Sequence, residues 1–253
     1  MAHILGMDVG SGFVKAAVLE GRAVLAYAIV PSGGSFAGAA KAASAAALEK
    51  ASLSASDIAA TVATGYGAEA AGFTGRTVAD ISCHAAGAFH LFPSARTVVD
   101  IGSQFCRAIR LDGNGRVSNF IHNEKCAGGS AKFLQVIARI LHMRVEDIGA
   151  LSLESTRPVE FTTGCAVFAE SEAVSRIAEG ARPADILAGV HKAIAAKIAN
   201  LTVRLGLAED CVVTGGGAKD IGLVRALEAE LGIRVRVPEE PWVSGAIGAA
   251  LLA

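Results

Sequence analysis

The sequence has few aromatic side chains and few cysteines. Phenylalanine, tryptophan and tyrosine make up only 5% of the 253 residues, so the core must be built from aliphatic side chains and close backbone packing. That composition suits helices lying on sheets. The five cysteines are an odd number and include no C-x-x-C pair. A disulfide framework is therefore not expected, and a reducing, cytoplasmic setting fits best.

The chain also lacks the marks of two broad classes of partner. Its net charge is -1 and no basic stripe is visible, which argues against nucleic acid binding. No uncharged apolar run reaches the roughly 18 residues of a membrane span. The apolar N-terminus is interrupted by Asp8 and has no basic leader, so no secretory signal is expected.

What the chain does contain is a pattern of strands and helices that occurs twice. The first half predicts strands over 3–8, 13–19, 22–30 and 58–64, with helices over 36–53 and 77–92. The second half predicts strands over 97–100, 106–111, 116–121, 212–214 and 234–237, and helices near 130–142, 145–153, 165–179, 183–205, 221–231 and 244–251. This duplication indicates two related α/β units.

Each half opens with a strand followed by Asp-x-Gly-Ser. The first copy is Asp8-Val9-Gly10-Ser11, and Asp100-Ile101-Gly102-Ser103 follows about 92 residues later. Glycine turns expose backbone N–H groups that can cradle phosphate oxygens, and the aspartate can hold Mg²⁺ directly or through water. One such motif is also typical of an ordinary β-turn, but two copies at equivalent points of a repeat favour a phosphate site.

Further candidates flank these two turns. Gly12 belongs to the first turn, and Lys15 can place a point charge on the phosphate chain. Gln104 in the second turn can orient a water molecule for attack on the γ-phosphate.

A third glycine motif, Thr214-Gly215-Gly216-Gly217-Ala218-Lys219, joins a strand to a helix. Glycines there permit a flat nucleoside ring to slide between two backbone segments, with Lys219 or Asp220 near its edge; a plain strand–helix turn is the alternative. Thr64-Gly65-Tyr66-Gly67 either lines the same cleft or, as slightly favoured, simply ends a strand. No segment has the form G-x-x-x-x-G-K-[ST], so this is not a P-loop site.

Two cysteines share one local design. Cys126 precedes small residues and a helical pattern, and Cys165 follows a glycine and opens a helix. Helix starts favour an anion, such as an iron–sulfur cluster held by thiolates, although a buried cysteine beside a helix cap looks the same. One chain offers two such thiols, so a twofold dimer would be needed to supply four.

The remaining cysteines and the histidines are expected to be structural. Cys83, Cys106 and Cys211 are assigned to packing. Five histidines show no metal-ligand spacing and are assigned to the surface or to helix caps: His84, His90, His122, His142 and His191. Trp242 is assigned to packing. Glu170 and Glu172 near the start of a predicted helix are explained by the helix dipole alone.

Taken together, the motifs resemble the ATP-dependent activators of 2-hydroxyacyl-CoA dehydratases and the related ATP-binding subunits of benzoyl-CoA reductase, in the actin and sugar-kinase superfamily. The resemblance covers essentially the whole chain. It rests on both Asp-x-Gly-Ser motifs and on the segments Ala63–Gly67, Asn123–Gly129, Gly164–Glu172 and Thr214–Gly217. The cysteine motifs are the specific ones, because sugar kinases share the nucleotide motifs and lack these.

The resemblance implies an α/β fold of two duplicated RNase H-like domains, each a mixed sheet with flanking helices, with the nucleotide in the cleft between them. The first domain would span residues 1–95. The second would span residues 96–253 and carry the cluster cysteines and the adenosine site, while the C-terminal helix could return to the first domain.

The implied function is ATP hydrolysis coupled to low-potential electron transfer. The cofactors would be ATP, Mg²⁺ and one [4Fe–4S] cluster that bridges two subunits. Cys126 and Cys165 of each subunit would be its ligands, and the assembly would be a homodimer or a heterodimer with a related chain. Asp8, Asp100 and Gln104 would be catalytic. Reduced ferredoxin or flavodoxin would donate the electron, and an acyl-CoA dehydratase or reductase carrying iron–sulfur clusters would receive it.

The second phosphate turn departs from the family pattern. The family usually continues as Gly-Gly-Gln-Asp, with Lys after one further residue, where this chain has Gly102-Ser103-Gln104-Phe105-Cys106-Arg107. An aromatic ring thus replaces a carboxylate near the nucleotide. The alternative function is a small-molecule kinase of the sugar-kinase superfamily with inert cysteines. A catalytic aspartate on a substrate loop and a sugar-binding insertion, which would favour it, are not evident.

Overall fold

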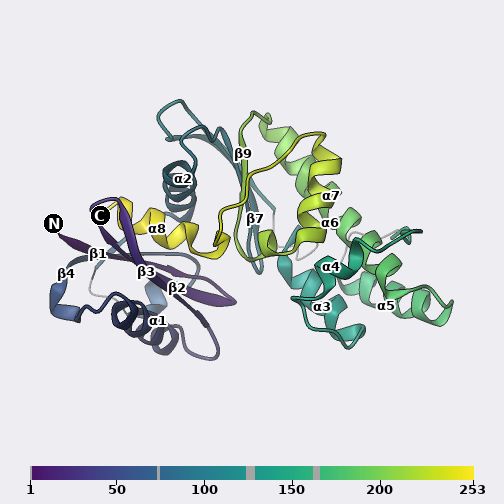
Figure 1. The fold of residues 1–253 in the computed structure, drawn as a ribbon, viewed down its shortest axis with the longest axis horizontal. Helices are drawn as coiled ribbons and strands as arrows, with labels where there is room; N and C mark the ends of the chain where they lie inside the picture. Colours follow the sequence, from purple (N-terminus) through teal and green to yellow (C-terminus); the bar gives the residue numbers. More distant parts are fainter. Residues whose placement is uncertain (1, 73–74, 124–128, 162–165) are drawn as a thin grey trace.

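Two mixed β-sheets form the frame of the protein, as seen in a computed structural model that describes residues 2–72, 75–123, 129–161 and 166–253 (Figure 1). The first sheet contains β1 (His3–Val9), β2 (Phe13–Glu20), β3 (Ala23–Pro31), β4 (Ile58–Thr64) and β5 (Arg76–Thr77), in the order β3-β2-β1-β4-β5. The second contains β6 (Thr97–Ile101), β7 (Cys106–Leu111), β8 (Val117–His122) and β9 (Cys211–Thr214), in the order β8-β7-β6-β9.

The two sheets repeat one arrangement of strands. In each, the opening strand pairs antiparallel with the next strand and parallel with the strand that leads into a glycine motif. The opening strands are buried along most of their length, as expected for strands covered on both faces. The α/β fold with mixed sheets and flanking helices that the sequence predicts is therefore confirmed.

Helices cover both faces of the first sheet. One face carries the alanine-rich α1 (Phe36–Lys50), whose N-terminus is capped by the Ser35 hydroxyl accepting the Gly38 N–H. The other face carries α8 (Ser244–Leu251), which packs against Ala17 and Leu19 of β2. Both chain ends consequently lie beside the first sheet (Figure 1).

A helix pair joins the two sheets. α2 (Asp80–Leu91) packs on the second sheet and also against α8, which lies on the first. The two helices meet backbone to backbone, because a β-carbon at Gly87 would overlap the Ser244 carbonyl and one at Gly248 would overlap the Cys83 carbonyl. Glycines on facing helices thus allow a close contact between the two halves.

The other face of the second sheet carries the largest core of the described residues. It is built from α3 (Ala131–Ile140), α4 (Ile148–Ser152), α5 (Ala166–Ala178), α6 (Pro183–Leu205) and α7 (Ile221–Leu231). By length and composition α6 could cross a membrane, but more than half of its apolar stretch is buried inside this core. We therefore describe it as a core helix.

One predicted strand is wrong. Residues 234–237 form only a single bridge, between Arg236 and Val212, with two backbone hydrogen bonds to the edge of β9. Pro238 follows immediately and has no N–H to continue the pairing.

Candidate nucleotide site

A cavity of about 540 Å³ opens between the two sheets, within the range of roughly 300–1,000 Å³ usual for ligand sites. It lies at the ends of β1, β4, β6 and β9, so motifs far apart in the sequence meet there. All of the residues predicted to bind or hydrolyse the nucleotide line it: Asp8, Gly10, Ser11, Gly12, Lys15, Asp100, Gly102, Ser103, Gln104, Gly215, Gly216, Gly217 and Lys219. Gly65 and Tyr66 line it too, so the favoured assignment of that segment as a mere strand end is wrong.

The two phosphate turns have the same backbone design. The Gly10 N–H donates to the Phe13 carbonyl at 3.1 Å, and the Gly102 N–H donates to the Phe105 carbonyl at 2.9 Å. The turns approach each other closely, because a β-carbon at Gly12 would overlap the Ser103 hydroxyl. These two hydrogen bonds close the turns, and the following residues, Ser11, Gly12 and Ser103, line one cavity, as phosphate binding by backbone N–H groups requires.

Two further glycines bring backbone against the aspartates. Gly65 and Gly215 have φ values of 93° and 82°. A β-carbon at Gly65 would lie 2.6 Å from Asp8 Oδ1, and one at Gly215 would lie 2.5 Å from Asp100 Oδ1. Only glycine suits both the conformation and the close approach.

Asp8 forms a buried ion pair with a lysine of the neighbouring strand. Lys15 lies opposite Asp8 in the β1–β2 register and donates to Asp8 Oδ2 at 2.9 Å. Burial alone would raise the pKa of Asp8, but Lys15, His84 and Arg107 outweigh it and hold that pKa below its usual 3.8. The cavity thus holds a charged carboxylate at neutral pH.

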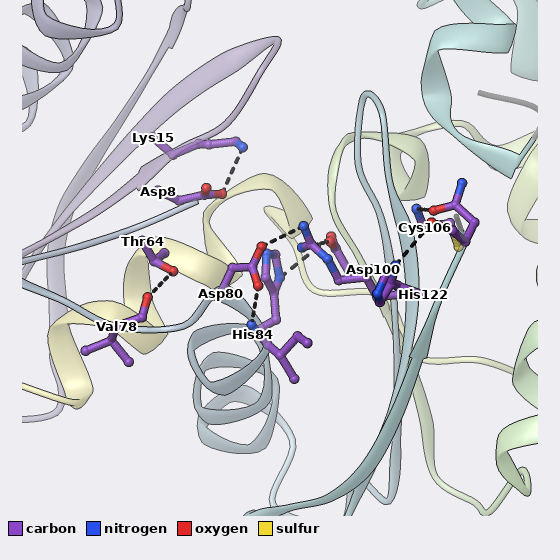
Figure 2. A network of polar contacts seen from close by, with 12 residues as sticks. Asp8, Lys15, Thr64, Val78, Asp80, His84, Asp100, Cys106 and His122 are labelled. Atoms are coloured by element: carbon purple, nitrogen blue, oxygen red, sulfur yellow. Dashed lines mark hydrogen bonds and ion pairs between the residues drawn. The ribbon is translucent and has the colours of Figure 1, made fainter. Parts of the chain in front are cut away.

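Asp100 occupies the equivalent position in the second sheet, and its partner is shared. Arg107 lies opposite Asp100 in the β6–β7 register and donates from Nη1 to Asp100 Oδ2 at 3.0 Å. Its Nη2 lies 2.7 Å from Asp80 Oδ2, in the first turn of α2 (Figure 2). One guanidinium fork thus joins two carboxylates. Neither Asp80 nor Arg107 is assigned a role from the sequence. The seven-residue spacing of Arg107 from Asp100 equals that of Lys15 from Asp8 and is the signal that could have identified it.

Two histidines predicted at the surface or at helix caps are buried, which corrects that assignment. His84 is 4% exposed and lines the cavity, with Nδ1 3.6 Å from Asp100 Oδ1. His191 is 1% exposed, and its Nε2 lies 3.1 Å from Asp220 Oδ2. In both cases the helix face that carries the histidine packs against another helix, which the spacing of histidines in the sequence does not reveal.

Two polar side chains at and just after the end of the third glycine motif line the cavity and already have partners. Lys219 donates to Glu240 Oε2 at 3.1 Å. Asp220 accepts the Leu223 N–H at 2.9 Å, which caps α7, and its other oxygen faces His191. Asp220 is therefore primarily a structural residue, with both carboxylate oxygens engaged.

Trp242 does more than pack. It lines the cavity, its ring contacts Phe13 edge to face at a centroid distance of 4.3 Å, and a β-carbon at Gly216 would lie 3.5 Å from it. Among the described residues its buried Nε1 has no hydrogen-bond partner. The tryptophan thus joins the first phosphate turn to the third glycine motif.

The aromatic ring in the second phosphate turn makes a contact between the two halves. Phe105 lies 6.4 Å from the Tyr66 ring and 5.8 Å from the Arg107 guanidinium carbon. A carboxylate at this position would add a third acid near Asp100, whereas Phe105 supplies apolar contact area.

The donor set suits Mg²⁺ bound together with phosphate. Within the described ranges no three His, Cys, Asp or Glu side chains converge on a point that could hold a metal. Mg²⁺ needs fewer protein ligands than that, since it binds through one or two carboxylates plus phosphate oxygens and water. Asp8 and Asp100, both buried and both lining the cavity, fit this requirement.

The predicted cluster ligands, Cys126 and Cys165, lie outside the described residues. The three described cysteines are buried and free, as expected for packing residues. Burial raises the pKa of the Cys83 thiol to about 11 and that of Cys211 to about 12, and it also raises the pKa of Cys106. Burial therefore keeps these three thiols protonated at neutral pH.

The fold and the site define a class of protein: a two-part nucleotide-binding scaffold of the actin and sugar-kinase type. A ROK family glucokinase from Streptomyces griseus, solved with glucose and AMPPNP, superposes on all of this chain and 99% of its own with a TM-score of 0.61 at 16% identity, which shows a shared fold. The chain matches the BadF/BadG/BcrA/BcrD ATPase family over residues 5–253 and belongs to it.

The relatives within this family cover nearly the whole chain. The (R)-2-hydroxyglutaryl-CoA dehydratase activating ATPase of Acidaminococcus fermentans is 39% identical over 99% of this chain and 96% of its own. The 2-hydroxyisocaproyl-CoA dehydratase activator of Clostridioides difficile is 37% identical over 99% of this chain and 94% of its own. A structure of that kind of activator from Clostridium difficile with bound ADPNP has a TM-score of 0.95 at 36% identity, covering 99% of this chain and 94% of that one.

Proposed function

We propose that this protein is an ATPase that activates an acyl-CoA dehydratase or reductase of the 2-hydroxyacyl-CoA or benzoyl-CoA type by transferring single electrons at low potential. The observation that carries the proposal is the cavity, where both Asp-x-Gly-Ser turns and the third glycine motif come together between the two sheets. The full-length similarity to dehydratase activators supports the choice of partner.

Different residues around the cavity would bind different parts of ATP. The N–H groups of Ser11, Gly12 and Ser103 in the two phosphate turns would cradle the phosphates, with Lys15 adding positive charge. Gly10 and Gly102, whose own N–H groups close the turns, would let the phosphates approach the backbone closely. Asp8 and Asp100 would hold Mg²⁺ through its water shell, and the ion would neutralise charge on the phosphates. Gln104 would orient the attacking water. Gly215, Gly216, Gly217 and Lys219 would take the adenosine.

The two halves would act as domains, residues 1–95 and 96–253, with the helix pair α2 and α8 between them. Binding and hydrolysis of ATP at their junction would change how closely they approach, as in other hinged enzymes. α3 and α5 belong to the second half and pack against each other, so a movement of that half would carry both.

Cys126 and Cys165 would hold one [4Fe–4S] cluster between two subunits, a copy of this chain or a related one. α5 begins directly after Cys165, and α3 begins five residues after Cys126, so the packing of these two helices supports a common location for the thiols. α5 also exposes Phe168, Val174 and Ile177, which are 66%, 53% and 42% exposed. Such an apolar surface supports a subunit contact there. Reduced ferredoxin or flavodoxin would supply the electron, in the cytoplasm.

Anaerobic purification with iron analysis and measurement of subunit stoichiometry tests this proposal. Four irons shared by a dimer give about two per chain, and the preparation should be brown. Cys126→Ser and Cys165→Ser should each remove the iron, whereas Cys211→Ala, at a neutral buried thiol, should retain it. A colourless, iron-free protein that phosphorylates a small molecule would instead establish a kinase.

A further inference from the structure

His84 stands between the two aspartates that the halves contribute to the cavity. Its Nδ1 lies 3.6 Å from Asp100 Oδ1. On the other side of the ring, Nε2 points toward Asp8. A β-carbon on Gly245 would lie 3.0 Å from His84 Nε2 and 3.2 Å from Asp8 Oδ2, so both atoms border the same small space. Figure 2 shows the imidazole rising from α2 toward Asp100, with Asp8 on the opposite side. One side chain therefore faces both carboxylates.

The position of the imidazole is set by helices. His84 lies in the second turn of α2, and the missing side chain of Gly245, at the start of α8, leaves the space that the ring and Asp8 share. Gly87 and Gly248 allow α2 and α8 to meet backbone to backbone, so the helix that carries His84 lies against the helix that covers the first sheet. His84 therefore lies at the junction between the two halves.

The His84 ring has a nitrogen that can still form a hydrogen bond. Among the residues that the structure describes, the buried Nδ1 has no hydrogen-bond partner, and 3.6 Å to Asp100 is too long for one. A shift of under about 1 Å would bring that pair to hydrogen-bond distance. At Asp100, Arg107 engages Oδ2 and the imidazole faces the other oxygen, Oδ1. At Asp8, the imidazole faces Oδ2, the oxygen that Lys15 also engages.

We propose that His84 is a positioning residue for ATP hydrolysis, which orients Asp8 and Asp100 relative to each other as the two halves close. This inference rests on the proposed ATPase function. The two nitrogens of an imidazole point in different directions, so one ring can contact two carboxylates at once. The proposed role requires that Nδ1 reach Asp100 and that Nε2 reach Asp8. Loss of the ring should slow hydrolysis and leave nucleotide binding, which uses the turns and the glycine motifs, largely intact.

Three substitutions separate the two sides of the ring. His84→Asn keeps an amide nitrogen near the place of Nδ1, toward Asp100, and His84→Gln keeps one near the place of Nε2, toward Asp8. His84→Leu removes both. The matched control is His90→Asn on the same helix, because His90 contacts Arg22 and is not among the residues that line the cavity.

The experiment measures kcat and KM for Mg·ATP, the affinity for a non-hydrolysable ATP analogue without Mg²⁺ by Trp242 fluorescence, and the melting temperature. We expect His84→Leu to lower kcat by about 10- to 100-fold, as for other residues that orient metal-binding carboxylates. KM and analogue affinity should stay within about threefold, since the lost interaction acts in the transition state. His84→Asn or His84→Gln should recover part of kcat, and His90→Asn should match the wild type.

Two results would overturn the role of His84. One is wild-type kcat in His84→Leu. The other is a parallel loss of kcat, analogue affinity and melting temperature in all three variants, which would show a purely structural residue. A wild-type protein that binds ATP and does not hydrolyse it would refute the ATPase proposal itself, so the two failures are distinguishable.

Discussion

The two buried aspartates are equivalent in the repeat, yet we predict that neutralising them has unequal effects on stability. Asp8→Asn leaves the Lys15 ammonium, which is 14% exposed, without a charged partner among the described residues. Breaking a buried ion pair from one side typically costs about 3–5 kcal/mol. Asp100→Asn leaves Arg107 paired with Asp80 at 2.7 Å, so the loss is mainly one charge-assisted hydrogen bond, about 1.5–3 kcal/mol.

The difference, about 2 kcal/mol, corresponds to a melting temperature lower by about 4–8 °C in Asp8→Asn than in Asp100→Asn for a chain of this size. Differential scanning calorimetry of the two variants at pH 7 and low salt measures it directly. As a control, the double variant Asp80→Asn/Asp100→Asn should approach Asp8→Asn, because Arg107 then loses both partners. Equal melting temperatures for the two single variants, or a lower one for Asp100→Asn, would refute the reasoning that the second carboxylate protects Arg107.

Three other predictions follow from the same contacts. The pKa of Asp8 is lower in the folded protein than its ordinary value of 3.8, so the ionised carboxylate stabilises the fold above that pH, and this stabilisation is lost as the pH falls through the pKa of the folded state. In calorimetry, the difference in melting temperature between the wild type and Asp8→Asn should therefore shrink between pH 7 and pH 3. Gly248→Ala should lower the free energy of unfolding by about 2 kcal/mol or more in urea titrations, since its β-carbon would overlap the Cys83 carbonyl, whereas Gly113→Ala, with open space around it, should change it little. Trp242 is the single tryptophan and lines the cavity, so ATP should change the intrinsic fluorescence of the wild type, and Trp242→Phe should abolish that change; an unaltered wild-type spectrum at saturating ATP would contradict the placement of the nucleotide.

The features that could be predicted from the sequence are those with local causes. Strands ending in Asp-x-Gly-Ser are recognisable because a tight turn needs its glycines in place, and the repeat of that motif doubles the signal. The helices follow from apolar spacing and agree with the structure to within a few residues. The meeting of all three glycine motifs in one cavity follows from the repeat, because equivalent strands end at equivalent edges.

The features that could not be predicted depend on distant packing. His84 is buried because Gly245 and Gly248, in the last helix, allow α2 and α8 to touch. The link from Asp80 to Arg107 requires α2 to lie beside β7, which no spacing within either segment reveals. The strand predicted over 234–237 does not form, although its alternating arginines and valines suit a strand, because the segment makes only a single bridge to the edge of β9.

The measurement that tests the central claim most directly is a redox titration, followed by electron paramagnetic resonance, of the anaerobically purified protein with ADP and with ATP. If nucleotide turnover between the two halves acts on a cluster held by Cys126 and Cys165, the spectrum and midpoint potential must depend on which nucleotide fills the cavity. A cluster whose spectrum and potential are the same with ADP, with ATP and without nucleotide would contradict the account.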